Sequence, residues 1–285
     1  MKKFKTFSKI MMTIAVVVAA GIMSSGVALA QKSKDTVRFG LYQPIKILDR
    51  IYNPHPETNL TAPAVYDNLM FYDAAERKYK PQLAVSWKRL NAKSIEFKLR
   101  KGVKYHDGSD FDADDVVYMT NFVTNPKTKF RFKGSRFGWI KGVEKIDRYT
   151  VRIHSKGPNA SMMSRLATAL PIYPSDVHGA LKTKSDFGRN PVGTGPYKVV
   201  KVDSNRGIFF EINKNYYAGS KPAGIVGKLI ALPIPDKQTQ IAQLMSGGLD
   251  IMYNVPKDQG ENLAANPNLG ISVTPTVSFV YVLFD

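Results

Sequence analysis

One stretch of the sequence gathers side chains that could do chemistry. His106 is followed within nine residues by five aspartates, which stand at positions 107, 110, 112, 114 and 115. An imidazole beside carboxylates is a ligand set for metals, and two carboxylates across a cleft can carry out acid–base hydrolysis. The stretch therefore raises two hypotheses, a metal centre and a pair of catalytic acids.

The spacing supports neither hypothesis. A calcium loop starting at Asp110 needs glycine at its sixth position and glutamate at its twelfth, but these positions hold Asp115 and Asn121. None of the four histidines stands four residues from another, so the usual helical zinc motif is missing. The chain has no cysteine and no sequence of the form G-x-S-x-G, H-E-x-x-H or P-loop. We expect no metal, no cofactor and no catalytic residue.

The same residues fit the beginning of a helix. Asp112 is a good N-cap, and Asp115 at N3 completes a capping box. Asp107-Gly108 would form the turn that precedes the helix. The apolar face would then consist of Val116, Met119 and Val123. The aspartate cluster is thus interpreted as structural.

The surrounding elements alternate between strand pairs and helices. Strands are predicted at residues 36–41, 84–88, 94–100, 143–147, 150–154, 197–202, 208–212, 228–232, 249–253, 270–273 and 278–284. Helices are predicted at residues 62–69 and 112–123, after Pro158-Asn159 through about residue 167, and at 236–245. The last would have Ile241, Leu244 and Met245 facing inward and Gly247-Gly248 as its stop. This order indicates an α/β fold with mixed sheets.

The first thirty residues have the pattern of a secretory signal. Four lysines precede an apolar run from Ile10 to Met23, and Ala28-Leu29-Ala30 forms a small-x-small cleavage site. The run is too short to span a bilayer. Because there is no cysteine, lipid attachment at a mature N-terminal cysteine is excluded, and a periplasmic location is expected in a Gram-negative cell.

The chain carries a net charge of +18. Removal of residues 1–30 leaves 37 basic and 23 acidic residues, a net charge of +14. The lysines are spread along the sequence and no nucleic-acid module is present, so nucleic acid is not expected as a partner. A solvated basic surface is the simpler interpretation, and attraction to an anionic membrane or to an acidic partner stays open.

Several motifs occur together in one order: Tyr66-Asp67-Asn68-Leu69, KPQLAVSW at 80–87, FKLRKGVKYHDGSDFDADDVVY at 97–118, IDRYTVRI at 146–153, NPVGTGPYKVV at 190–200 and IPDKQTQIAQLMSGGLDI at 234–251. They resemble the extracellular solute-binding proteins that serve peptide, nickel and opine ABC importers. The family pattern usually has Phe at Tyr105, Thr or Ser at Asp112, and Asn near Asp285.

The resemblance implies a periplasmic binding protein-like type II fold, with two lobes and an extra domain. Residues 31–49 and 187–272 would form the first lobe, and residues 50–186 the inserted domain. From residue 273 the chain would cross toward a second lobe. Because an apolar strand stands at the end of the sequence, we expect that this lobe is truncated.

The implied function is capture of a solute and its delivery to the permease of an ABC importer. The expected solute is an oligopeptide or dipeptide, and the protein is expected to be a monomer and not an enzyme. A metal chelate, an opine or a sugar is the alternative within the family, and a hydrolase or chaperone the alternative outside it. Candidate ligand-binding residues are Tyr42 and Gln43 at a strand end, the aromatic-basic group Arg136, Phe137 and Trp139, and Tyr281 and Asp285 near the crossover.

Overall fold

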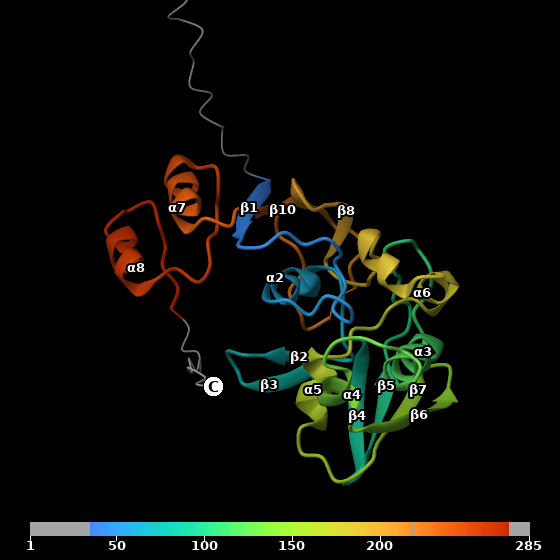
Figure 1. Cartoon of the computed structure of the whole chain (residues 1–285). Coiled ribbons are helices and arrows are strands. Elements are labelled where there is room, and N and C mark those ends of the chain that lie inside the picture. Colours follow the sequence, from blue (N-terminus) through green and yellow to red (C-terminus); the bar gives the residue numbers. More distant parts are fainter. Residues whose placement is uncertain (1–34, 218, 274–285) are drawn as a thin grey trace, which may run out of the picture. The chain divides into compact units, whose positions relative to one another are not determined.

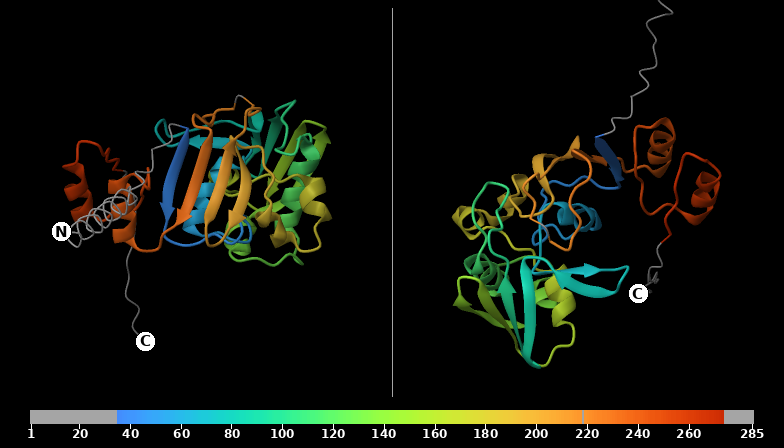
Figure 2. Two further views of the ribbon diagram at one scale, coloured as in Figure 1. Left: turned by 90° about the horizontal axis from the view of Figure 1, so that it is seen from above. Right: turned by 180° about the vertical axis from the view of Figure 1, so that it is seen from behind.

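A computed structural model describes residues 35–217 and 219–273 of the protein. Its first sheet contains β1 (Thr36–Leu41), β10 (Lys228–Pro233), β9 (Gly207–Ile212) and β8 (Tyr197–Asp203) in that order (Figures 1 and 2). β1 and β10 are parallel, whereas the β10–β9 and β9–β8 pairs are antiparallel. All four strands were predicted from the sequence, and these predictions are confirmed.

The second sheet is antiparallel throughout. Its order is β4 (Ala84–Asn91), β5 (Ser94–Leu99), β7 (Thr150–Ser155) and β6 (Ile140–Asp147). Buried apolar side chains alternate with more exposed ones along β5 and β7, as expected where one face of a sheet meets a core. Helix α3 (Ala113–Thr124) contacts β6 and β7. Both predicted strand pairs are therefore confirmed.

The remaining elements are short. β2 (Met70–Asp73) and β3 (Lys78–Pro81) form a separate hairpin. The α-helices are α2 (Pro56–Thr61), α4 (Lys133–Phe137), α5 (Met162–Thr168), α6 (Ser175–Ala180), α7 (Lys237–Ser246) and α8 (Lys257–Ala264). The described residues also include the 3₁₀ helices η1 (Ala62–Ala64) and η2 (Lys184–Arg189). In the described part of the chain, we find no helix long and apolar enough to cross a membrane.

Three predictions differ from the structure, and two lie outside the described residues. The helix predicted at 62–69 lies earlier, at 56–64, because Pro56 begins it and residues 65–69 turn toward β2. The strand predicted at 249–253 is reduced to a single parallel bridge between Ile251 and Phe39. Residues 270–273 are not in a strand. The signal peptide at 1–30 and the strand at 278–284 lie outside the described residues.

Helix α7 also differs in the face that it buries. Asp236 is its N-cap and Gly247 ends it with a left-handed φ of 80°, as predicted. Gln240, however, is its fully buried residue, while Met245 is 53% exposed. The reason is a close approach to β1: a Cβ on Gly40 would lie only 2.5 Å from Oε1 of Gln240. A polar side chain thus fills the space that the sequence pattern assigned to Ile241, Leu244 and Met245.

Candidate functional site

The aspartate cluster caps a helix. The backbone N–H of Asp114 donates to Oδ1 of Asp112 at 2.8 Å, and the N–H of Asp112 donates to Oδ2 of Asp115 at 3.1 Å. This is the predicted capping box at the start of α3. The predicted apolar face is confirmed as well, since Val116, Met119 and Val123 are fully buried. The carboxylates of Asp112 and Asp115 are therefore engaged in holding the helix terminus.

The other aspartates of the cluster have equally local partners. Oδ1 of Asp107 accepts hydrogen bonds from the N–H and hydroxyl of Ser109 within the turn. Asp110 and Asp114 each pair with a lysine at 2.6 Å, on the surface. Among the residues that the structure describes, no three histidine, cysteine or acidic side chains come together as a metal site would require. The structural interpretation of the cluster accounts for each of these carboxylates.

His106 connects the cluster to a glycine-containing loop. The N–H of Gly193 donates to its Nδ1 at 3.2 Å, so Nε2 carries the proton and donates to the carbonyl of Gly195 at 2.9 Å. Burial lowers the pKa of His106 to about 4, with the nearby Lys198 ammonium acting in the same direction. A neutral imidazole with both nitrogens engaged in the backbone is a structural bridge.

The motif Tyr66-Asp67-Asn68-Leu69 contributes a buried carboxylate that gathers distant segments. Oδ1 of Asp67 accepts from Nε2 of Gln82 at 3.0 Å and pairs with Nζ of Lys221 at 2.5 Å. Its Oδ2 accepts from the hydroxyls of Thr194 and Tyr217, at 3.0 and 2.8 Å. The motifs at residues 66–69, 80–87 and 190–200 therefore meet around the Asp67 carboxylate. These contacts within the fold account for their residue types without any contact to a ligand.

The strongest candidate for a binding site lies at the carboxyl end of β1, at the sheet edge formed by parallel segments. β1 runs parallel to β10 on one side and to the bridge at Ile251 on the other. The residues that follow these segments therefore emerge at the same edge. Tyr42 and Gln43 directly follow β1, and Tyr253 follows the bridge. This is where open α/β sheets receive ligands.

Two tyrosines dominate this edge. The Tyr42 hydroxyl donates to the backbone carbonyl of Tyr253, and their rings meet edge-to-face with centroids 5.0 Å apart. The Tyr253 hydroxyl lies 3.3 Å from Oε1 of the buried Glu57, to which it donates. Nζ of Lys237 lies 5.4 Å from the centre of the Tyr42 ring, a cation–π arrangement. Burial raises the pKa of Tyr42, so its phenol stays protonated.

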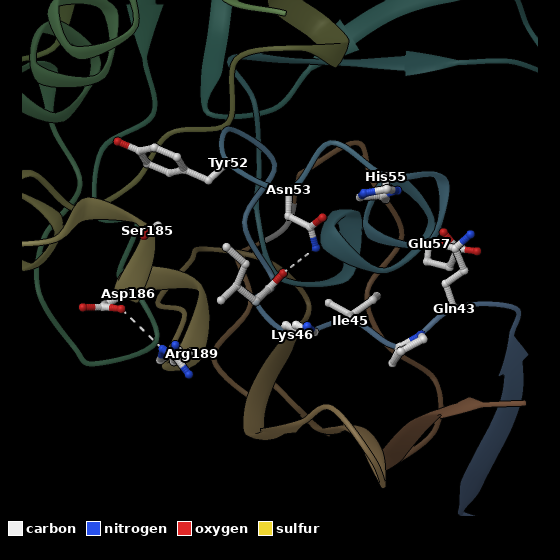
Figure 3. A pocket seen from close by; sticks show the side chains of 12 residues that line it. Gln43, Ile45, Lys46, Tyr52, Asn53, His55, Glu57, Ser185, Asp186 and Arg189 are labelled. Atoms are coloured by element: carbon white, nitrogen blue, oxygen red, sulfur yellow. Dashed lines mark hydrogen bonds and ion pairs between the residues drawn. The ribbon is translucent and has the colours of Figure 1, made fainter. Parts of the chain in front are cut away.

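Figure 3 shows a cavity of about 430 Å³ whose lining includes Gln43, which follows Tyr42 in the chain, and Glu57, which accepts from Tyr253. Gln43, His55 and Glu57 lie together on one side of it, and the ion pair of Asp186 and Arg189 lies on the other. Further lining residues are Pro44, Ile45, Lys46, Ile47, Tyr52, Asn53 and Ser185. Donors, acceptors and both charges are thus present, as recognition of a small polar solute requires. Of the predicted residues, Gln43 lines this cavity, and Tyr42 precedes it in the chain.

The predicted aromatic-basic group lies elsewhere and is used in packing. Arg136 donates to the backbone carbonyls of Arg50 and Ala169 at 2.7 and 3.0 Å, and burial lowers its pKa. Phe137 is only 2% exposed, and the indole N–H of Trp139 donates to the carbonyl of Arg136. Their role in ligand binding stays a prediction. Tyr281 and Asp285 lie outside the described residues.

Sequence reasoning missed Tyr253, Glu57 and Lys237 as neighbours of Tyr42. One signal could have found two of them. The sequence predicts a crossover unit, made of a strand at 228–232, a helix at 236–245 and a strand at 249–253. Such a unit places the start of the helix and the residue after the second strand at the carboxyl edge of the sheet. Glu57 carries no such signal, because it reaches the edge through the loop that follows β1.

One contact in the second sheet has the composition of a nucleophilic triad. Oγ of Ser94 lies 2.9 Å from Nδ1 of His154, whose Nε2 lies 3.6 Å from Oε2 of Glu144. Ser94 and His154 are opposite each other in the β5–β7 register, so their contact follows from strand pairing. The carboxylate is beyond hydrogen-bond distance and does not orient the ring, as a triad requires.

The chain was compared with known proteins. Residues 78–285 match bacterial extracellular solute-binding proteins, family 5, middle region. The heme-binding protein A of Haemophilus influenzae is 26% identical over 248 residues, an alignment covering 80% of this chain and 45% of that protein.

Two solved structures share the fold. AppA from Bacillus subtilis, an oligopeptide-binding protein in complex with a nonapeptide, has a TM-score of 0.73 and 26% identity over 80% of this chain and 45% of its own. NikZ from Campylobacter jejuni, in complex with Ni(L-His), has a TM-score of 0.72 and 27% identity over 82% of this chain and 46% of its own. The chain spans less than half the length of all three relatives. The predicted type II binding-protein fold is confirmed.

Proposed function

The chain belongs to family 5 of the bacterial extracellular solute-binding proteins, and from that premise we propose that it captures a peptide for delivery to an ABC importer. The observation that carries the proposal is the polar cavity beside Tyr42 and Gln43, at the carboxyl edge of the parallel segments. AppA, which shares the fold at 26% identity, was solved with a nonapeptide. A non-enzymatic role fits a family of binding proteins.

The proposed domain organisation follows the two sheets. Residues 31–49 and 187–272, which include the β1 sheet, would form the first lobe, and residues 50–186, which include the antiparallel sheet, the inserted domain. The separation of the strands into two sheets supports this division. From residue 273 the chain would cross toward a second lobe.

In the proposed mechanism the solute bridges two lobes and thereby favours their closed arrangement. A ligand can shift this equilibrium only by binding the closed state more tightly than the open one. Gln43, Asn53 and Glu57 would supply hydrogen bonds to the peptide backbone, and Tyr42 and Tyr253 an aromatic surface. The closed protein, a monomer exported by residues 1–30, would then dock on a membrane permease.

A metal chelate is the second candidate ligand. NikZ, similar to this chain at 27% identity and a TM-score of 0.72, was solved with Ni(L-His). A chelate would need only a few protein contacts to the metal, since its organic part fills most of the coordination positions. His55 is the side chain of the cavity that could provide one such contact.

Native mass spectrometry can separate these functions. A form of the protein that carries the proposed second lobe would be incubated with a mixture of di- to nonapeptides, or with nickel and histidine, and the retained mass identified. We expect retained peptides of unchanged mass. Retention of nickel–histidine alone would favour the chelate, shortened peptides would indicate hydrolysis, and retention of neither ligand would contradict the proposal.

A further inference from the structure

A second cavity, of about 520 Å³, is lined by four lysines. It lies between the end of α3 with its following loop and the segment that joins α6 to η2. Asn121, Asn125, Lys127, Thr128 and Lys129 come from the first side, and Lys182 and Lys184 from the second. Tyr52, Tyr118 and Phe122 supply aromatic surface. Among the described residues, no acidic side chain lines this cavity, which is named the lysine pocket below.

The positive charge of the lysine pocket is not compensated. Lys127, Lys129 and Lys182 form no ion pair with any carboxylate in the described part of the chain, in contrast to the pairs of Lys80, Lys104 and Lys145. Nζ of Lys184 donates to the backbone carbonyls of Gly179 and Leu181 at 2.6 and 2.7 Å, which are uncharged groups. Like charges held around one cavity raise its positive potential and attract anions.

The end of α3 does not cancel this potential. Helix carbonyls at a C-terminus carry partial negative charge, which would oppose an anion. A fifth lysine, Lys133, donates to the carbonyls of Asn125 and Thr128 and offsets that charge. The same field acts on the neighbouring His178, whose pKa burial lowers to about 4 with Lys184 contributing in the same direction.

We propose that the lysine pocket binds a phosphate-bearing group with at least two negative charges. A single carboxylate would balance only one of four ammonium groups, whereas a diphosphate or phosphomonoester matches several, and lysine binds phosphate as a point charge. The volume leaves room for a group attached to the phosphate, which the ring of Phe122 can contact. The phosphate could belong to a soluble phosphoester or to a lipid headgroup.

Two probes and two variants test the proposal. Binding of pyrophosphate is measured by calorimetry, and sedimentation is measured with phosphatidylcholine vesicles that contain or lack phosphatidic acid. The variant Lys127→Gln/Lys129→Gln/Lys182→Gln removes three charges from the lysine pocket. The control Lys78→Gln/Lys88→Gln/Lys214→Gln removes three exposed lysines that line none of the described cavities and make no described ion pair.

We expect the pocket variant to weaken binding of at least one probe by about tenfold or more, while the control keeps wild-type affinity within about twofold. Loss confined to pyrophosphate identifies a soluble ligand, and loss of binding to phosphatidic acid vesicles identifies a lipid headgroup. Equal weakening in both variants would show attraction by net charge alone and overturn the proposal. Absence of binding to both probes would overturn it too.

Discussion

Asp112 shows how one residue of the opening cluster acts. Its Oδ1 accepts from the N–H of Asp114, and its Oδ2 lies 3.2 Å from Nε of the exposed Arg148. The first contact is a helix cap. The second is a surface ion pair, which contributes little to stability.

Replacing Asp112 by Ala should therefore lower the free energy of unfolding by about 1 kcal/mol. The variant Asp112→Asn should keep most of the wild-type stability, because Asn is an equally good N-cap. Urea denaturation of both variants measures this. Peptide retention should not change. If Asp112→Ala lost binding without losing stability, the hypothesis of a ligand site in the cluster would return.

His106 predicts a pH dependence of stability. Its pKa is about 4 in the folded protein and 6.5 as the ordinary value. Above pH 6.5 the imidazole is neutral in both states. Between pH 6.5 and 4 the unfolded state binds a proton that the folded state does not, so stability falls with falling pH by roughly 3 kcal/mol at most.

The variant His106→Gln keeps a donor and an acceptor but does not titrate. We expect it to be less stable than the wild type at pH 7.5, with a difference that shrinks as the pH falls from 6.5 toward 4. Other buried groups, such as His178 and Asp49, have pKa values shifted to about 4 and about 6. They are present in both proteins, so their contributions to the pH dependence cancel in the stability difference. Denaturation curves that stay parallel over this range would show that His106 does not resist protonation.

At the level of elements, the sequence predicted the long strands and the start of α3 but not the short pieces. β5 and β7 alternate clearly, because one face of each is buried. The β2–β3 hairpin was missed, since no residue of the KYKP strand is fully buried and the strand lacks an apolar face. Helix α8 was missed for a related reason: Leu263 is its one buried residue.

The candidate site was predicted in part. Tyr42 and Gln43 were found because a strand end is visible in the sequence. Their neighbour Tyr253 was overlooked although the crossover pattern indicates its position, and Glu57 was not predicted because a long-range contact brings it to that end. Arg136 was predicted as a cation for a ligand carboxylate, and the structure shows that its guanidinium holds two backbone carbonyls, a contact that the sequence did not indicate.

The loop at 193–195 gives a prediction for glycine. A Cβ on Gly193 would lie 2.0 Å from the carbonyl oxygen of Val65, a backbone atom. Gly193→Ala should lower the free energy of unfolding by about 1–3 kcal/mol or more, because the loop must move away. Gly142→Ala is the control, since no heavy atom lies within 4 Å of its Cβ position. Similar stabilities for the two variants in thermal denaturation would contradict the close packing.

At the level of the whole molecule, Asp67 links segments separated by more than a hundred residues. Its partner Gln82 comes from the proposed inserted domain, and Thr194, Tyr217 and Lys221 come from the second segment of the proposed first lobe. Removal of such a carboxylate leaves a mostly buried ammonium without its counter-ion. The motifs at residues 66–69, 80–87 and 190–200 thus hold distant segments of the chain together through this carboxylate.

Asp67→Ala should therefore cost about 3–5 kcal/mol of stability. The double variant Asp67→Ala/Lys221→Met should recover part of this loss, because the unpaired charge is also removed. Guanidinium denaturation of the wild type and three variants, including Lys221→Met alone, completes the cycle. Additive effects would indicate that Asp67 and Lys221 do not interact.

The central claim is that a solute binds at the carboxyl edge of β1. The most direct measurement is cross-linking of the protein with a photoreactive tripeptide, mapped by mass spectrometry, with unlabelled peptide as competitor. The variant Gln43→Ala alters the exposed cavity residue, and Asn215→Ala is a matched control beyond β9 at the opposite edge of the same sheet.

We predict competitor-sensitive cross-links at Tyr42, Gln43 and Tyr253 or at the cavity residues Asn53 and His55, reduced in Gln43→Ala and unchanged in Asn215→Ala. Competitor-sensitive cross-links confined to other surfaces, or labelling of this edge that unlabelled peptide does not reduce, would contradict the account.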